Sequence, residues 1–148
     1  MLTITWADVV LWIHVIAACV WIGGQITLGM IVPMLRSEPE LVRDVARRFQ
    51  NAAWVAFGIL IVTGIINVHE AGISWAHLNA TPAARTLSIK LLFVVISGTA
   101  AALHAYWATP KLRNASARTR ALAVGGLGGV SLLAAIMAAL FGVVIAQS

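Results

Sequence analysis

The sequence predicts an all-α integral membrane protein, folded as an antiparallel bundle of four transmembrane helices. Hydrophobic residues make up 61% of the 148 residues, charged residues only 10%, and the mean hydropathy is +0.94. A soluble domain averages about 25% charged residues and has no core large enough for so much apolar surface. The apolar residues fall into four runs, each long enough to supply the roughly 20 residues that a spanning helix needs. The runs are too long and continuous for the alternating strands of a membrane barrel.

The four runs predict helices over about residues 5–32, 52–72, 84–109 and 119–146 of a single transmembrane domain, 1–148. The first run ends near Pro33, and the third lies between Pro82 and Pro110. No cation precedes Arg36, and the first run exceeds the h-region of a signal peptide, so we expect a retained helix.

The segment 37–49 is charged but also patterned. Leu41, Val45 and Phe49 recur at the spacing of one helix face, and Asp44 and Arg48 are i, i+4 partners of opposite charge. The pattern predicts an amphipathic cytoplasmic segment lying on the inner leaflet.

Cations are concentrated in two of the three connections between the predicted helices. Termini and segment 71–83 contain neither Lys nor Arg. Short loops rich in Lys and Arg stay in the cytoplasm, so both termini are expected on the outer, periplasmic side. Topology therefore explains the net charge of +5, and the expected partner is the lipid bilayer rather than nucleic acid. The cations are Arg36, Arg43, Arg47, Arg48, Lys111, Arg113, Arg118 and Arg120.

Ionisable groups inside the predicted spans are the candidate functional residues. Such groups are costly in lipid and usually face a protein interior, a cavity or a cofactor. His14 and Lys90 lie at similar depths below the outer surface, and His69 returns to the outer half at the end of the second helix. His104 lies 14 residues after Lys90, roughly 21 Å deeper, and therefore belongs to the inner half. The roles of His104 and His77 stay open.

Two imidazoles from facing helices can ligate a metal ion or supply both axial ligands of haem. His14 and His69 are the predicted metal ligands, and His14 with His69 or Lys90 opposite is the predicted haem set. The alternative interpretations are that His14 only hydrogen-bonds a neighbouring helix and that Lys90 extends to the outer surface. Cys19 is the single cysteine, which excludes a cysteine-cluster site, and motifs of proteases, kinases and ATPases are absent.

Several short strings resemble the copper-resistance protein D (CopD) family, in the order in which that family has them. Residues 14–24, HVIAACVWIGG, resemble its first helix, which carries His, small residues and then Trp-hydrophobic-Gly-Gly. The likeness covers about residues 11–113. The other matching strings are Pro33-Met34-Leu35, Arg47-Arg48-Phe49, Thr63-Gly64-Ile65-Ile66-Asn67, Ser88-Ile89-Lys90-Leu91-Leu92 and Pro110-Lys111-Leu112-Arg113.

The resemblance implies copper uptake or tolerance at the bacterial inner membrane, with His14 and Lys90 as functional positions. A periplasmic copper protein or a larger membrane complex is the implied partner. The chain is also similar to HemJ-type proteins, which are linked to protoporphyrinogen oxidation, place His in helix one and Lys in helix three, and bind haem b. Copper and haem b therefore remain alternative cofactors, and an accessory subunit of a larger complex is a third possibility. An enzyme is expected only in the haem case, as a membrane oxidoreductase.

Overall fold

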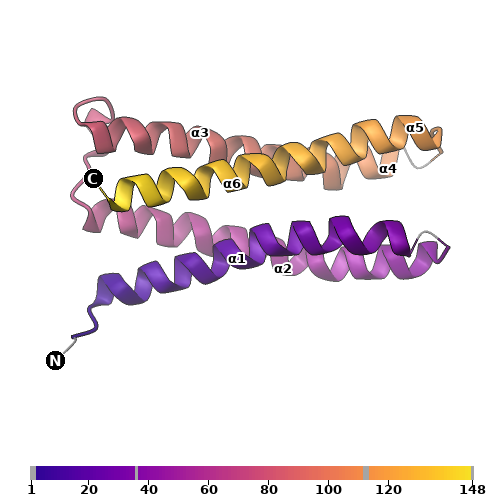
Figure 1. Ribbon diagram of the computed structural model, residues 1–148, viewed down its shortest axis with the longest axis horizontal. Helices are drawn as coiled ribbons and strands as arrows, with labels where there is room; N and C mark the ends of the chain where they lie inside the picture. The colour runs from indigo at the N-terminus through magenta and orange to yellow at the C-terminus, as the bar shows by residue number, and fades with distance from the viewer. Residues whose placement is uncertain (1–2, 36, 112–113, 148) are drawn as a thin grey trace. The chain divides into compact units, whose positions relative to one another are not determined.

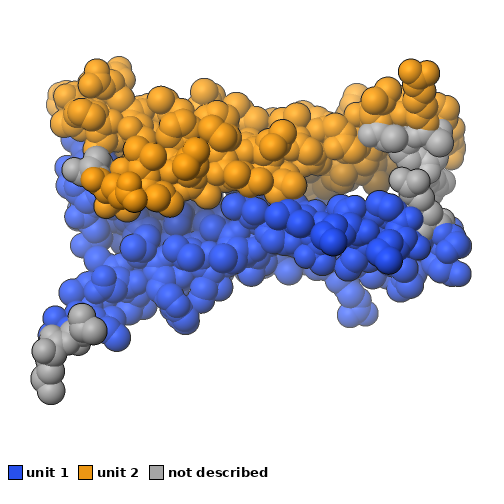
Figure 2. Space-filling view, viewed as in Figure 1, with its two compact units in different colours: residues 1–76 blue, residues 77–148 orange. Residues whose placement is uncertain are grey.

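The computed structural model describes residues 3–35, 37–111 and 114–147 and is helical almost throughout. Within the described residues, four helical spans have the length and apolar composition needed to cross a membrane: Trp6–Met34, Pro39–Glu70, Pro82–Lys111 and Leu122–Ala146. The chain divides into two compact units, residues 1–76 and 77–148, which are coloured separately in Figure 2. Each unit is a helical hairpin, here called the first and the second hairpin.

The first hairpin pairs α1 (Trp6–Met34) with α2 (Pro39–Glu70), both labelled in Figure 1. A capping box starts α1, because the Asp8 amide donates to the Thr5 hydroxyl while the Asp8 carboxylate accepts from the Thr5 amide. The contacts between the helices run in opposite chain directions: His14 meets Thr63, and Gly24 meets Phe49. The hairpin is therefore antiparallel.

α2 includes the segment that the sequence analysis separated from the second span. Residues from Pro39 onward are helical, as the amphipathic pattern predicts, but they continue into the span without a break. Neither Gly nor Pro occurs between Glu40 and Phe57, so nothing in the backbone interrupts the helix. The predicted boundary at residue 52 is therefore not a boundary of the helix.

α2 ends at Glu70 because Gly72 adopts φ +67°, a conformation that favours glycine. The amide of Gly72 donates to the His69 carbonyl, and the amide of Ile73 donates to the Val68 carbonyl. These two bonds form a Schellman motif, which satisfies carbonyls at the helix end. The helix stops two residues before the predicted end at 72.

An aromatic cluster packs the first hairpin. Trp21 is 4% exposed, and its ring centroid lies 4.6 Å from that of Phe57 and 5.7 Å from that of Trp54. Ala17 on α1 and Ala53 and Ala56 on α2 are also buried. Small residues of this kind allow close approach of membrane helices.

The short helix η1 (Trp75–His77) lies at the junction of the two units, and α3 (Pro82–Ala102) is the first long helix of the second hairpin. The helix of α3 continues through a π-helical segment, η2 (Leu103–Ala108), into α4 (Thr109–Lys111). The return limb consists of α5 (Ala117–Arg120), a second π-helical segment η3 (Ala121–Gly125) and α6 (Gly126–Ala146). The spans predicted over 84–109 and 119–146 thus correspond to composite helices with a π-helical segment in each.

Two serines join α3 to α6 in the middle of the second hairpin. The Ser97 hydroxyl donates to the Ser131 carbonyl at 2.9 Å, and the Ser131 hydroxyl donates to the Ser97 carbonyl at 3.0 Å. Both side chains are 1% exposed. α3 and α6 also contact each other through the rings of Phe93 and Phe141, which stack with their centroids 5.7 Å apart.

At this serine pair, we expect added side-chain volume to lower stability more than the loss of a hydroxyl group does. Ser97→Ala is expected to lower stability in detergent by about 0.6 kcal/mol, the average for hydrogen bonds between membrane helices. Ser97→Val also adds bulk at a closed contact and is expected to cost about 1–3 kcal/mol. Thermal unfolding followed by circular dichroism measures both. Equal effects of the two variants would contradict the close packing described.

Candidate functional site

His14 is the interior histidine of the first hairpin, and the structure fixes the orientation of its ring. Its Nδ1 lies 2.8 Å from the hydroxyl oxygen of Thr63 on α2. The Thr63 hydroxyl donates its single proton to the Ile59 carbonyl at 2.6 Å, so it accepts from His14. Nδ1 therefore carries the proton of the neutral ring, and Nε2 carries the lone pair.

The surroundings of His14 are small and mostly apolar. Thr63 is 7% exposed, and His14 is half-buried. A Cβ added at Gly64 would lie 3.4 Å from the Cε1 of His14, so the ring rests against the backbone of α2 at this glycine. Thr63 and Gly64 together hold the imidazole, one by a hydrogen bond and the other by leaving room for the ring.

His69, the second predicted metal ligand, is exposed on α2. It follows Thr63 by six residues, roughly 9 Å along the axis of an α-helix and about 240° around it. Hence α2 does not present His69 on the face that contacts His14. The described residues contain no group of three or more His, Cys, Asp or Glu side chains placed to hold a metal ion. Ligation of one ion by His14 and His69 together stays a prediction.

Lys90, the third predicted site residue, belongs to the second hairpin and is half-buried on α3. A Cβ added at Gly142 on α6 would lie 3.2 Å from the Lys90 ammonium nitrogen. Because Gly142 has no side chain, the Lys90 ammonium group can lie close to the backbone of α6 at this residue. Among the described residues, the structure records no ion pair of Lys90 with a carboxylate.

His104 is fixed in the second hairpin much as His14 is in the first. Its Nδ1 donates to the backbone carbonyl of Val124 at 2.8 Å, since a carbonyl only accepts. An added Cβ at Gly128 would lie 3.6 Å from both Cε1 and Nδ1 of the ring. His104 lies in η2 and Val124 in η3, so this bond joins the two π-helical segments. His77, by contrast, is exposed in η1.

The side-chain amide of Gln25 donates to the Trp21 carbonyl at 3.0 Å, a bond within α1. Sequence analysis missed Thr63, Val124 and Gly142 as neighbours of the ionisable groups. The Thr-Gly pair at 63–64 was visible in the sequence, but helix spacing alone does not show which residue of the next helix lies opposite His14.

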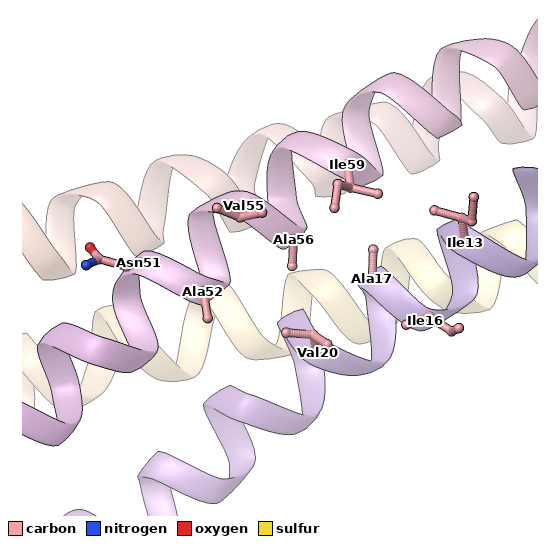
Figure 3. A pocket seen from close by; sticks show the side chains of 9 residues that line it. All are labelled: Ile13, Ile16, Ala17, Val20, Asn51, Ala52, Val55, Ala56 and Ile59. Atoms are coloured by element: carbon pink, nitrogen blue, oxygen red, sulfur yellow. The ribbon is translucent and has the colours of Figure 1, made fainter.

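A shallow apolar groove of about 450 Å³ lies between α1 and α2 (Figure 3). Its lining is aliphatic except for Asn51, and it contains neither histidine nor a charged residue. The groove is therefore distinct in chemistry from the His14–Thr63 contact, although Ile13 lines one end of it.

Comparison with known families decides the assignment. The family pattern described as "Copper resistance protein D" matches residues 43–147. The chain belongs to the copper resistance protein D family. It is thus a multi-pass membrane protein of a copper-related family, as the resemblance predicted. The matched region contains Thr63, His69, Lys90 and His104, whereas His14 precedes it.

One curated relative of this CopD-family chain is a protein of Aquifex aeolicus (strain VF5) described as "Uncharacterized protein". The two are 29% identical over 68 residues, which is 42% of this chain and 48% of the relative. The matched part thus spans about half the length of that relative. No solved structure matches the chain. The similarity to HemJ-type proteins stays a prediction.

Proposed function

We propose that this CopD-family protein handles copper, for uptake or tolerance, at a bacterial inner membrane, with His14 as the interior ligand. The observation that carries the proposal is the hydrogen bond from His14 Nδ1 to Thr63, whose hydroxyl is itself fixed by the Ile59 carbonyl. Histidines that bind metals almost always donate their other ring N–H to such an acceptor, which fixes the tautomer and raises ligand basicity. Imidazole nitrogen is a suitable donor for copper.

The arrangement in the membrane is part of the same proposal. Each hairpin would cross the membrane twice, with both termini on the periplasmic side. Exposed cations at one end of each hairpin support this orientation, among them Arg43, Arg47 and Arg48 on α2 and Lys111 on α4. His14 would then lie in the outer half of the membrane.

His69 and Lys90 have separate roles in this proposal. His69 is exposed at the outer end of α2, where it would bind copper delivered from the periplasm before the ion reaches His14. Lys90 adds a positive charge at similar depth and would limit how tightly a cation is held. A periplasmic copper protein is the partner that this order of events requires.

The test is copper retention by the protein purified in detergent. Samples are loaded with Cu(I) without oxygen, freed of excess metal and assayed by elemental analysis. His14→Ala is expected to lose most of the copper that the wild type retains, because the interior ligand is gone. His77→Ala, which removes an exposed histidine of η1, is the matched control and should retain wild-type copper. Equal retention by His14→Ala and the wild type would remove His14 from the site.

The alternative function, a b-type haem protein in electron transfer or porphyrin oxidation, is distinguished by the same samples. Haem with His14 as axial ligand gives an intense Soret absorbance, whereas the copper protein is colourless in the Cu(I) state. A Soret band that His14→Ala abolishes would replace the copper proposal by the haem proposal. Lys90→Ala and His69→Ala would then identify the opposite ligand.

A further inference from the structure

We propose that the groove between α1 and α2 binds one anionic phospholipid, with an acyl chain along the groove and the phosphate held by Arg47, Arg48 and Asn51. The proposal concerns the first hairpin alone and does not depend on copper. A phospholipid combines a hydrocarbon chain with a negative charge at one end of it. The groove and the arginines offer the complementary arrangement, an aliphatic channel with positive charge beside one end.

The groove has the surface that a hydrocarbon chain fits. Its floor contains Ala17 and Ala56, which are 4% and 5% exposed and whose side chains point toward each other in Figure 3. Two alanines in this position leave a depression between the helices, which the exposed side chains of Ile16, Val20 and Val55 border. Inside a membrane, van der Waals contact with such a surface is what favours binding of an apolar chain.

Polar and charged groups stand at one end of the groove. Asn51 is the polar residue of the lining and lies at the end opposite Ile13 (Figure 3). Arg47 lies one helical turn before Asn51, and Arg48 lies one turn before Ala52, which also lines the groove. Residues four apart share a face of an α-helix, so both arginines continue the side of α2 that borders the groove.

The positive charge of these arginines is available to an anion. On α2 the recorded ion pair joins Arg43 to Glu40, with 2.8 Å between nitrogen and oxygen. Within the described residues, neither Arg47 nor Arg48 pairs with a carboxylate. Guanidinium groups bind phosphate through paired N–H donors, and basic pockets between helices at the cytoplasmic side of a membrane bind anionic headgroups.

The length of the groove favours a lipid over a small anion. From Arg48 to Ile59, α2 rises about 16 Å, close to half of the roughly 30 Å hydrocarbon core. An acyl chain that follows the groove from a headgroup at Arg48 therefore reaches the middle of the membrane, as the chains of one leaflet do. In the proposed topology this is the cytoplasmic leaflet, where anionic lipids give the surface its negative potential.

The first test compares two lipids with identical acyl chains, phosphatidylglycerol and phosphatidylcholine, by native mass spectrometry of the delipidated protein in detergent. The wild type is expected to bind phosphatidylglycerol about 30-fold more tightly, at about fivefold for each arginine. Arg47→Gln with Arg48→Gln should remove most of this preference. Arg43→Gln is the matched control on another side of α2 and should keep it. An unchanged preference in the double variant, or an equal loss in the control, would overturn the proposal.

The second test fills the groove. Ala52→Leu adds bulk to the lining and is expected to abolish most of the phosphatidylglycerol binding, whereas Ala139→Leu, at an exposed position of α6, should bind as the wild type does. Wild-type binding by Ala52→Leu would mean that the arginines hold a phosphate with no chain in the groove, which would overturn the proposal. A second copy of the chain seated on the groove would leave the wild type without a lipid preference, and that result would overturn it as well.

Discussion

Replacing Gly24 with alanine is expected to destabilise the first hairpin by about 1–3 kcal/mol, although the new side chain is a single methyl group. The Phe49 ring of α2 occupies the place that a Cβ at Gly24 would take. The ring has to leave this position, so the half-buried aromatic contact between α1 and the start of α2 is lost. Thermal unfolding in detergent measures the effect.

The neighbouring glycine supplies the control. A Cβ at Gly23 would meet nothing within 4 Å, so Gly23→Ala should be neutral or stabilising by up to about 1 kcal/mol, the helix-propensity gain. Phe49→Ala should make Gly24→Ala nearly neutral in the double variant, because the overlapping ring is absent. Additive losses in the double variant would show that Gly24 and Phe49 are not in contact.

Thr63→Val is expected to lower copper affinity roughly 10–100-fold, the usual effect of removing the hydrogen-bond partner of a metal-bound histidine. Valine keeps the shape of the side chain but offers no acceptor to His14 Nδ1, so the ring loses its fixed tautomer and orientation. Thr63 is a positioning residue in this account. Competition with a Cu(I) chelator measures the affinity.

Two further variants separate positioning from packing. Thr63→Ser restores the hydroxyl and should recover most of the affinity. Thr27→Val removes a threonine hydroxyl that donates to the Gly23 carbonyl within α1, and copper affinity should be unchanged. If Thr63→Ser bound copper as weakly as Thr63→Val, the hydroxyl would not be the group that matters.

The sequence predicted the helical membrane fold because hydrophobic length is a local property. Each of the four apolar runs can be recognised from its own residues. So can the proline at residue 82 near the start of the third span and the change of pattern after Pro33. Helix ends were harder to place where a special backbone conformation decides them. Gly72 ends α2 through its positive φ, and the helix from Pro39 runs through a charged stretch because nothing in that stretch breaks it.

The candidate histidines were also visible in the sequence, because imidazole and ammonium groups are expensive in lipid and therefore conspicuous there. Family membership was indicated by short strings in order, and the match over residues 43–147 agrees with it. Which group orients each ring could not be read from the chain. That depends on acceptors that lie 49 residues from His14, at Thr63, and 20 residues from His104, at Val124.

By itself, the sequence determined that this protein lies in a lipid bilayer and where its helical spans run. It also determined which side chains have the chemistry to ligate a metal. All three follow from composition and local pattern. Only the tertiary structure decided what surrounds each histidine. Helix pairing places Thr63 beside His14 and turns His69 to another side of α2, and the π-helical segments bring Val124 to His104. The physical reason is that a hydrogen bond needs an acceptor within about 3 Å, and only packing sets that distance.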